Sequence, residues 1–270
     1  MIENQLVYLY CVTSKEPSLE KVRDMIDNAY FVCHKGFYAV TRNVEEGEFG
    51  LEGLRKNMAD LEWVKTNATL HERVIEQIMK DTCVIPFKFG TLFNTDDSLK
   101  AMLQEYDEEF KAILDRLKNK EEWGVKIYCD VEKLKTFSIN DEPEILEIEN
   151  KINSSSPGKA FFLEKKKTEL LAQAANRKIN ESGQESFDLL KDLSFEARIN
   201  KLLPKEVTER EDEMILNSVF LINKDEVDDF TSMVDTLKIH YENEGFSIDC
   251  TGPWPPYNFC GLPNQKVPNA

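Results

Sequence analysis

The sequence predicts an α+β protein of two domains, each a small mixed or antiparallel sheet with helices on one face, and a proline- and aromatic-rich C-terminal tail. Three observations support this prediction. Short apolar or alternating runs, typical of strands, are interleaved with longer segments whose apolar residues recur every three or four positions, as in helices. A polar stretch over residues 140–156 divides the chain. The 270 residues are 41% apolar, which is enough for sizeable cores.

The first domain is expected over residues 1–139. Residues 6–12 form an unbroken apolar run, typical of a strand covered on both faces. Ser18 is placed to cap a short helix, and residues 30–41 indicate a β-hairpin that turns at a glycine. The segment 45–53 combines glutamates with glycines, so we expect an exposed loop there.

Two helices and a strand complete this domain, giving the order β-α-β-β-α-α-β. Apolar side chains recur at helical spacing over residues 58–80. A longer apolar stripe over 99–117 follows a run of capping residues and predicts one long helix. Residues 125–131 alternate between apolar and polar, so we expect them to form the last strand of the same sheet.

The second domain is expected over residues 157–250, after a linker at 140–156. Ser156 followed by Pro157 is a strong helix start, and this helix should run toward residue 179. The later elements are expected to be two strands, a helix opened by a capping box, and a final strand, at 195–199, 214–222, 227–241 and 246–250. The order α-β-β-α-β is close to a ferredoxin-like sandwich.

The charge of the chain excludes some classes of function. Fifty acidic residues against 34 basic ones give a net charge of −16, which repels nucleic acid and anionic lipid. No apolar run approaches the roughly 20 residues that span a bilayer. The first residues lack the features of a signal peptide, and the six cysteines are scattered without a CxxC pair. We therefore expect a cytoplasmic protein with reduced thiols that binds neither nucleic acid nor membrane.

Residue patterns typical of catalysis are missing from the sequence. The three histidines, His34, His71 and His240, lie in different predicted elements and outside any metal-ligand spacing. His71 sits on an apolar helical stripe, where a structural histidine with both nitrogens hydrogen-bonded is favoured over a general base. No glycine-rich phosphate loop or nucleophile motif is present. The sequence therefore predicts no catalytic residue, cofactor or metal.

Two stretches resemble motifs of a known family. Residues 82–93 read TCVIPFKFGTLF, and residues 252–259 read GPWPPYNF. Both are similar to signature segments of the gas vesicle proteins of the GvpF/GvpL family, in the family's order. The helix that carries Trp63 and His71 before the first motif, and the long amphipathic helix after it, also fit. The resemblance therefore spans nearly the whole chain.

The resemblance implies an accessory protein for building gas vesicles, the gas-filled protein shells of some aquatic and soil microbes. The implied partners are the small, very hydrophobic shell protein GvpA and other Gvp accessory proteins, bound during nucleation of the shell. Retention as a minor shell component is also implied. The resemblance implies no enzymatic activity. An alternative is a cytosolic regulatory or small-molecule-binding protein on tandem ferredoxin-like domains, or a weak enzyme that uses His71.

The two motifs supply the candidate site residues. These are Pro86, Phe87, Phe89 and Gly90 in the first motif, and Gly252, Pro253, Trp254, Pro255, Pro256, Tyr257 and Phe259 in the second. Each set has either a structural role or a role in contacting a partner.

The tail, residues 251–270, is expected to be a strap that lies in a groove where the last strand leaves the second domain. Its prolines argue against a continuing strand, because proline cannot donate to a sheet ladder. Trp254→Ala should then cost on the order of 3 kcal/mol. The alternative is an open docking arm, in which case the same change would affect only partner capture.

Overall fold

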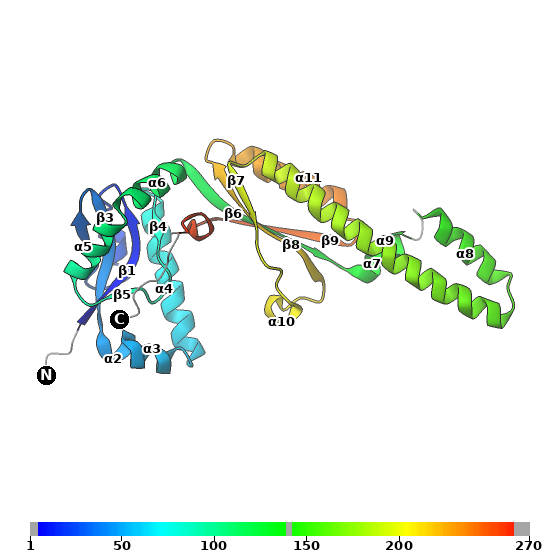
Figure 1. The fold of residues 1–270 in the computed structure, drawn as a ribbon, viewed down its shortest axis with the longest axis horizontal. Coiled ribbons are helices and arrows are strands. Elements are labelled where there is room, and N and C mark those ends of the chain that lie inside the picture. Colours follow the sequence, from blue (N-terminus) through cyan, green and yellow to red (C-terminus); the bar gives the residue numbers. More distant parts are fainter. Residues whose placement is uncertain (1–4, 139–141, 262–270) are drawn as a thin grey trace. The chain divides into compact units, whose positions relative to one another are not determined.

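The computed structural model describes residues 5–138 and 142–261, which fall into two compact units (Figure 1). The first unit comprises residues 1–122 together with 253–270, and the second comprises residues 123–252. The predicted domain limits of 1–139 and 157–250 differ from these units. The segment after residue 122 belongs to the second unit, and the segment after residue 252 belongs to the first.

The first unit is built on an antiparallel sheet with the strand order β2-β3-β1-β4, in which β5 also pairs with β1. The strands are β1 (Gln5–Thr13), β2 (Tyr30–His34), β3 (Phe37–Glu45), β4 (Ile85–Pro86) and β5 (Leu92–Phe93). Every residue of β1 after the first is buried, as expected for a strand covered on both faces. The pairing of β1 with β3 is interrupted by a bulge between Leu9 and Cys11.

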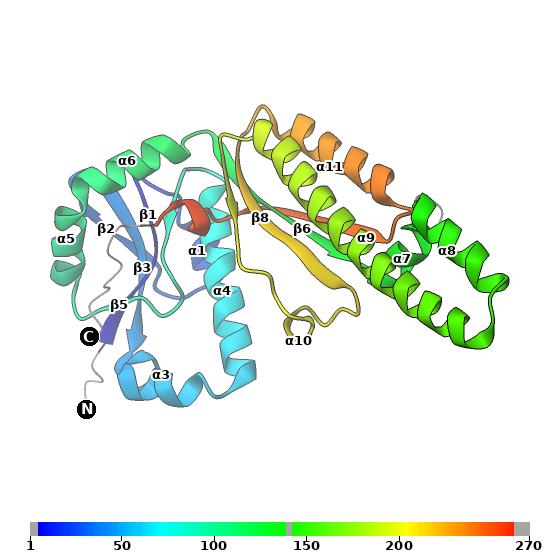
Figure 2. The same cartoon turned by 45° about the vertical axis from the view of Figure 1, so that its right-hand side comes forward.

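Helices cover both faces of this sheet (Figure 2). They are α1 (Glu20–Arg23), α2 (Glu46–Phe49), α3 (Leu51–Asn57), α4 (Leu61–Met79), α5 (Asp96–Glu105) and α6 (Asp107–Leu117). Side chains of α1 and α4 share a core cluster with Tyr8 and Tyr10. On the other side, the ring of Phe110 in α6 lies 5.8 Å from that of Phe37 and 6.2 Å from that of Phe87. The sequence predicted helices on one face of each sheet, so for this sheet the prediction is incomplete.

Local chemistry explains where several of these elements begin and end. Lys35 (φ 49°) and Gly36 (φ 85°) form the two-residue turn of the β2–β3 hairpin, as the sequence predicted. The Asp60 carboxylate accepts hydrogen bonds from the backbone of Glu62 and Trp63 and starts α4. Thr95 and Ser98 form a capping box for α5.

Three expectations for this unit were wrong. Ser18 does not cap α1, whose N-cap position is occupied by Leu19. The segment 45–53 is not a loop, because residues 46–49 form α2 and residues 51–53 belong to α3, with Gly50 between them. The predicted helix over 99–117 is two helices, because the backbone of Tyr106 (φ −102°, ψ 21°) leaves the helical conformation between α5 and α6.

The second unit holds a sheet with the strand order β7-β8-β6-β9. Its elements are β6 (Lys120–Cys129), α7 (Val131–Ser138), α8 (Pro143–Asn153), α9 (Pro157–Asp192), β7 (Glu196–Ile199), α10 (Lys205–Thr208), β8 (Glu213–Asn223), α11 (Val227–Tyr241) and β9 (Phe246–Trp254). The longer elements follow the order β6-α9-β7-β8-α11-β9, which is the β-α-β-β-α-β order of the ferredoxin-like motif. In this unit α9 and α11 lie on the same side of the sheet (Figure 1). Their buried residues, Phe187 and Phe230 among them, pack around Phe220 of β8.

The sequence prediction of the second unit also needs correction. Strand β6 was placed in the first domain, but it lies inside the second sheet, between β8 and β9. Part of the expected linker, residues 143–153, is helix α8, while residues 139–141 lie outside the described part of the chain. Helix α11 begins at an N-cap, Glu226, that makes no side-chain capping bond, so the predicted capping box is not formed.

Candidate functional site around His71

His71 lies on α4 at the centre of a buried polar cluster in the first unit. Its Nδ1 is 2.9 Å from the hydroxyl of Tyr8, and its Nε2 is 2.9 Å from the carbonyl oxygen of Phe87. A carbonyl can only accept, so Nε2 carries the proton and Nδ1 accepts from Tyr8. The Tyr8 hydroxyl in turn accepts from the backbone N–H of Gly90 at 3.1 Å. Both ring nitrogens of a neutral imidazole are therefore hydrogen-bonded.

Burial determines the protonation state of this cluster. The pKa of His71 is lowered from 6.5 to about 4, mainly by burial, with a smaller contribution from the charge of Arg42 and against the opposing effect of the Phe87 carbonyl. Burial also raises the pKa of Tyr8 well above its usual range. At neutral pH the imidazole is uncharged, and its accepting nitrogen is occupied by Tyr8. This geometry fits the predicted structural histidine and not an accessible general base.

Aromatic rings surround the imidazole. The ring of Tyr10 stacks on it at 5.3 Å between centroids, and the rings of Tyr8 and Phe89 meet it edge-on at 5.6 and 5.9 Å. Trp63, which the resemblance pairs with His71, packs against Phe89 at 6.0 Å, and its indole N–H donates to Glu48 at 2.7 Å. The enclosure keeps water away from the ring and explains the depressed pKa of His71.

The first motif runs along the edge of β1. Ile85 and Pro86 pair with β1 as β4, and the N–H of Phe87 donates to the Tyr10 carbonyl at 2.9 Å. The chain then leaves the strand at Lys88 and returns at Leu92, where β5 pairs with β1 again. Pro86 and Phe87 are buried, and Phe89 is half-buried. These residues therefore stabilise the His71 cluster from the interior of the first unit.

Gly90 and Thr91 shape the loop between β4 and β5. Gly90 has φ +79°, a conformation that side chains of L-residues rarely adopt. The Thr91 hydroxyl donates to the Lys88 carbonyl at 2.7 Å and closes the loop. This geometry explains why a glycine and a hydroxyl residue stand side by side in the motif.

The second motif reaches the same cluster from the far end of the sequence. Strand β9 ends at Trp254, and the buried Pro255 and Pro256 lead into a 3₁₀ turn, η1 (Tyr257–Phe259). The Tyr257 hydroxyl donates to Glu72 at 2.9 Å and lies 3.3 Å from Nε2 of His71. Burial raises the pKa of Tyr257, and the nearby Glu72 charge raises it further. The two motifs therefore meet at His71.

Further polar bonds hold the tail in the first unit. The buried carboxylate of Glu122 accepts from the backbone N–H of Asn258 at 3.1 Å and from its side-chain amide at 2.6 Å. Arg116 donates to the Phe259 carbonyl. The Phe259 side chain is fully buried, with 0% of its surface exposed. Residues 255–260 thus form part of the core and surface of the first unit.

The tail binds the protein itself, as the strap hypothesis expects. Its hydrogen-bond partners, Glu72 and Glu122 among them, belong to the first unit. Trp254 keeps 45% of its surface exposed, so the anchoring rings are Tyr257 and Phe259. Strand β9 also continues through Gly252 and Pro253, which the sequence argument had excluded from a strand. Residues 262–270 of the predicted tail lie outside the described part of the chain.

Sequence reasoning missed the residues that join the two motifs. Tyr8 was assigned only to an apolar strand, and Glu72, Arg116 and Glu122 were given no role in a site. A buried carboxylate and an exposed one look the same in a sequence of 31% charged residues. The position of Glu122 immediately before Trp123 gives no hint of its bonds to Asn258.

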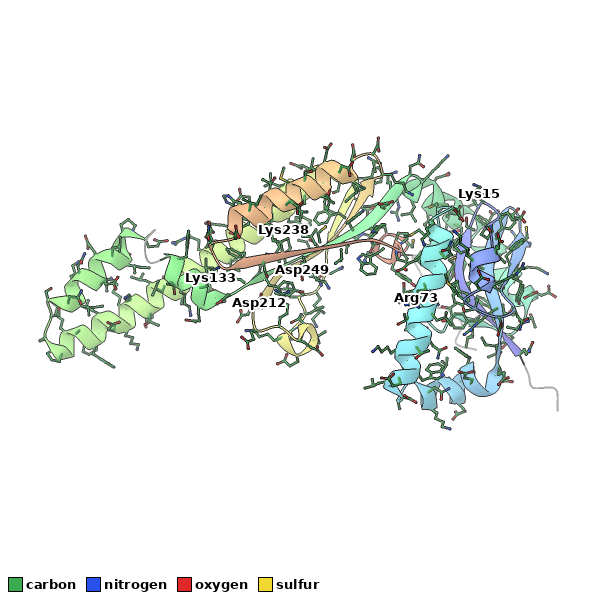
Figure 3. The ribbon with its side chains drawn as sticks, turned by 180° about the vertical axis from the view of Figure 1, so that it is seen from behind. Lys15, Arg73, Lys133, Asp212, Lys238 and Asp249 are labelled. Atoms are coloured by element: carbon green, nitrogen blue, oxygen red, sulfur yellow. The ribbon has the colours of Figure 1, made fainter. Side chains whose placement is uncertain are left out.

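A second polar cluster lies on the second unit. The guanidinium of Arg210 bonds to both carboxylate oxygens of Asp212 at 3.0 and 2.9 Å, to Asp249 at 3.2 Å and to Ser247 at 2.9 Å. It also lies 4.0 Å above the ring of Tyr128. Figure 3 labels the two aspartates, which lie near each other on this unit. The guanidinium therefore links the segment before β8 to Ser247 and Asp249 of β9 and to Tyr128 of β6.

The described residues contain neither a metal-binding group nor a membrane-spanning helix. Within residues 5–138 and 142–261, no three His, Cys, Asp or Glu side chains are grouped so that they could hold a metal ion. In the same ranges, none of the helices combines the length and the apolar character needed to cross a membrane.

Comparison with known proteins gives consistent matches over most of the chain. The sequence model of the family described as "Gas vesicle synthesis protein GvpL/GvpF" matches residues 6–261. Gas vesicle protein L of a Streptomyces species is 24% identical over 243 residues, which cover 87% of this chain and 84% of that protein. Gas vesicle protein L1 of Halobacterium salinarum is 28% identical over 262 residues, covering 93% and 89%.

A solved structure shows the same fold. The crystal structure of the gas vesicle protein GvpF from Anabaena sp. PCC7120 matches with a TM-score of 0.72 at 19% identity, over 96% of this chain and 100% of that one. This match confirms the α+β fold class that the sequence predicted.

Proposed function

The chain belongs to the gas vesicle synthesis protein GvpL/GvpF family, and we propose that it acts in gas vesicle formation by binding the shell protein GvpA and other Gvp accessory proteins. Family membership supports the role in gas vesicle formation. The observation that carries it is the family match over residues 6–261, which includes both motifs that meet at His71. Binding of GvpA during nucleation of the shell is the more specific part of the proposal.

The charge of the chain supports binding of a hydrophobic subunit. A protein with net charge −16 keeps its complexes dispersed by mutual repulsion, while local apolar contacts hold the subunit. In this proposal the protein works in the cytoplasm while the shell is being nucleated, and it can remain with the vesicle as a minor component. In this proposal it is a binding protein and not an enzyme.

The motif residues support this function from inside the fold. Pro86, Phe87 and Phe259 are buried, and the motif residues next to them form hydrogen bonds within the first unit. In the proposal they hold the first unit in the shape that partners bind. Among the motif side chains, Trp254 is a large apolar one with 45% of its surface exposed, and it is the proposed point of direct contact.

The proposal is tested by deletion in the host and by capture of GvpA. Deleting the gene should abolish or sharply reduce vesicles, and the wild-type chain should restore them. Immobilised full-length protein should capture GvpA, and Trp254→Ala should capture less of it while keeping its melting temperature. Normal vesicles in the deletion strain would contradict the role. Restored vesicles without any capture of GvpA would contradict the partner alone.

The alternative of a weak enzyme using His71 predicts a different result. His71→Gln keeps a donor and an acceptor at this position, so a folded variant should still restore vesicles in the deletion strain. A folded variant that fails to do so would favour a chemical role for the imidazole.

A further inference from the structure

Strand β9 forms one border of the sheet in the second unit. In the order β7-β8-β6-β9 its neighbour is β6, and among the strands that the structure describes none pairs with its other side. Strand β9 is nine residues long, whereas β7 at the opposite border has four. An edge strand of this length presents a row of unpaired N–H and C=O groups, which is a template for another strand.

The pairing of β9 with β6 is regular. The N–H of Asp130, just after β6, donates to the carbonyl of Gly245, just before β9, at 2.9 Å. Near the other end of the ladder, Gly124 faces Thr251, whose hydroxyl oxygen lies 3.4 Å from where a Cβ on Gly124 would stand. Both strands advance by the same number of residues between these two positions, so no bulge interrupts the ladder there.

This register shows which backbone groups of β9 point away from β6. Residues of an antiparallel ladder alternate between bonding to the neighbouring strand and pointing away from it. The bonded series starts at the residue before β9 and continues through Ser247 and Asp249. The N–H and C=O groups of Phe246, Ile248 and Cys250 therefore point to the open side. In the described part of the chain, no backbone hydrogen bond joins these three residues to another element.

The usual protection of an edge strand is missing from residues 246–252. This segment contains neither lysine nor proline, and the charge of Asp249 is paired with Arg210 at 3.2 Å. Strand β2, at a border of the first sheet, differs because α5 lies beside it. Tyr30 and His34 of β2 are hydrogen-bonded to side chains of α5. Strand β9 is thus the long border that remains open to pairing.

We propose that β9 of one chain pairs antiparallel with β9 of a second copy of the chain, with Ile248 opposite the partner's Ile248. In this register the outward groups of Phe246 meet those of the partner's Cys250. Three residue pairs then exchange about six backbone hydrogen bonds. The sheets of the two copies join into one continuous sheet, and the main-chain bonds supply the affinity.

The side chains of β9 favour this register and this partner. Apolar and polar residues alternate symmetrically about Ile248, so apolar residues face apolar residues on the side that the helices cover. On the other side, Asp249 lies opposite the partner's Ser247, which bonds to the partner's Arg210. Centring the pair on Asp249 would instead place two carboxylates directly opposite each other, which is destabilising. Strand β9 is therefore complementary to itself in both backbone and side chains.

The contact is isologous, because the same strand is used on both sides. Pairing occupies the open side of β9 in each copy, so association stops at two chains. The inference goes beyond the proposed function and does not depend on binding of GvpA.

The first test is sedimentation of the full-length chain over a range of protein concentrations. The mass of the wild type should rise from 31.3 kDa to twice that value and no further. Cys250→Pro removes one outward N–H and leaves the bonds between β9 and β6 in place, so this variant should stay at the monomer mass. Cys250→Ala keeps that N–H and is the matched control, which should associate like the wild type.

The second test examines the register by disulfide formation under mild oxidation. Ser247→Cys and Asp249→Cys, mixed as two separate full-length variants, place thiols on residues that lie opposite each other, with Cα atoms about 4.5 Å apart. The mixture should form a cross-linked pair that is lost on reduction. Either variant alone should not, because its two thiols are diagonal neighbours about 7–8 Å apart. The wild type is the control for the native cysteines, such as the exposed Cys33.

Each result either supports the inference or overturns it. A wild type that stays monomeric at every concentration would overturn it, as would association beyond two chains. Association of a folded Cys250→Pro variant would show that the contact lies elsewhere. If that variant does not fold, the disulfide test decides. Cross-linking that is no stronger in the mixture than in either variant alone would contradict pairing about Ile248.

Discussion

His71 couples the stability of the first unit to pH. The two hydrogen bonds of its ring require the neutral form, because a protonated Nδ1 would lose its bond from Tyr8 and place a charge among aromatic rings. The folded chain therefore resists protonation at this residue, whereas the unfolded chain does not.

The expected consequence is a loss of stability in mild acid. The pKa of His71 is about 4 when folded, against 6.5 for the free side chain. Between these values the unfolded chain binds a proton that the folded chain does not, so the free energy of unfolding falls as the pH is lowered from 6.5 to about 4. The fall amounts to about 3 kcal/mol. Denaturant unfolding at a series of pH values measures it.

His71→Gln should remove this slope, and His240→Gln, an exposed histidine on α11, should keep it. The raised pKa of Glu72, caused by burial, acts with the opposite sign, because the folded chain holds that proton more tightly. That contribution is present in the wild type and in both variants, so the comparison isolates His71. Equal slopes for the wild type and His71→Gln would contradict the assignment.

Tyr257 contributes through a single hydroxyl. Tyr257→Phe keeps the ring but removes the donor to Glu72, leaving a half-buried carboxylate without that bond. We expect a loss of about 1–3 kcal/mol in the free energy of unfolding at neutral pH. Tyr38→Phe on β3 is the matched control and should change stability much less. An unchanged unfolding curve for Tyr257→Phe would show that water replaces the bond at no cost.

At the scale of elements, the tail stabilises the first unit through η1 and not through the end of β9. Phe259→Ala empties a fully buried site, so we expect a loss of about 3–5 kcal/mol. Trp254→Ala, at a residue that is 45% exposed, should cost far less. Thermal unfolding of the two variants gives the comparison. A larger effect at Trp254 than at Phe259 would mean that the tail is anchored elsewhere.

The sequence predicts elements better than their partners. The hairpin at Lys35 and Gly36 was predicted because its turn chemistry is local. Strand β6 was recognised but assigned to the wrong sheet, because alternation shows which residues of a strand face inward and not which strands lie beside it. Helix α8 was missed because its polar composition suggested a linker, although Ile145 and Ile148 have helical spacing.

The candidate site shows the same limit. Both motifs were found from residue patterns, and the sequence favoured a structural role for His71, which the hydrogen bonds at both ring nitrogens fit. Their meeting point was not found, because the bond between Tyr257 and Glu72 joins residues 185 positions apart. No local pattern carries that information.

At the scale of the whole molecule, the two units should respond separately to loss of the tail contact. In Phe259→Ala, amide hydrogen exchange should speed up in β1 and β4, which line the His71 cluster. Strand β8, in the core of the second unit, should keep its protection. The full-length variant is compared with the wild type under the same conditions. Equal loss of protection in β1 and β8 would show that the units unfold as one.

The division of the first unit between two distant parts of the sequence has a consequence for the order of synthesis. Residues 5–122 leave the ribosome first, then the whole of the second unit, and only afterwards residues 255–260. Until these residues emerge, the Glu72 and Glu122 carboxylates lack their tail partners. The nascent first unit therefore stays incompletely packed while the 130 residues of the second unit are translated. A translation pause in that interval would prolong exposure of the His71 cluster and would favour capture by chaperones.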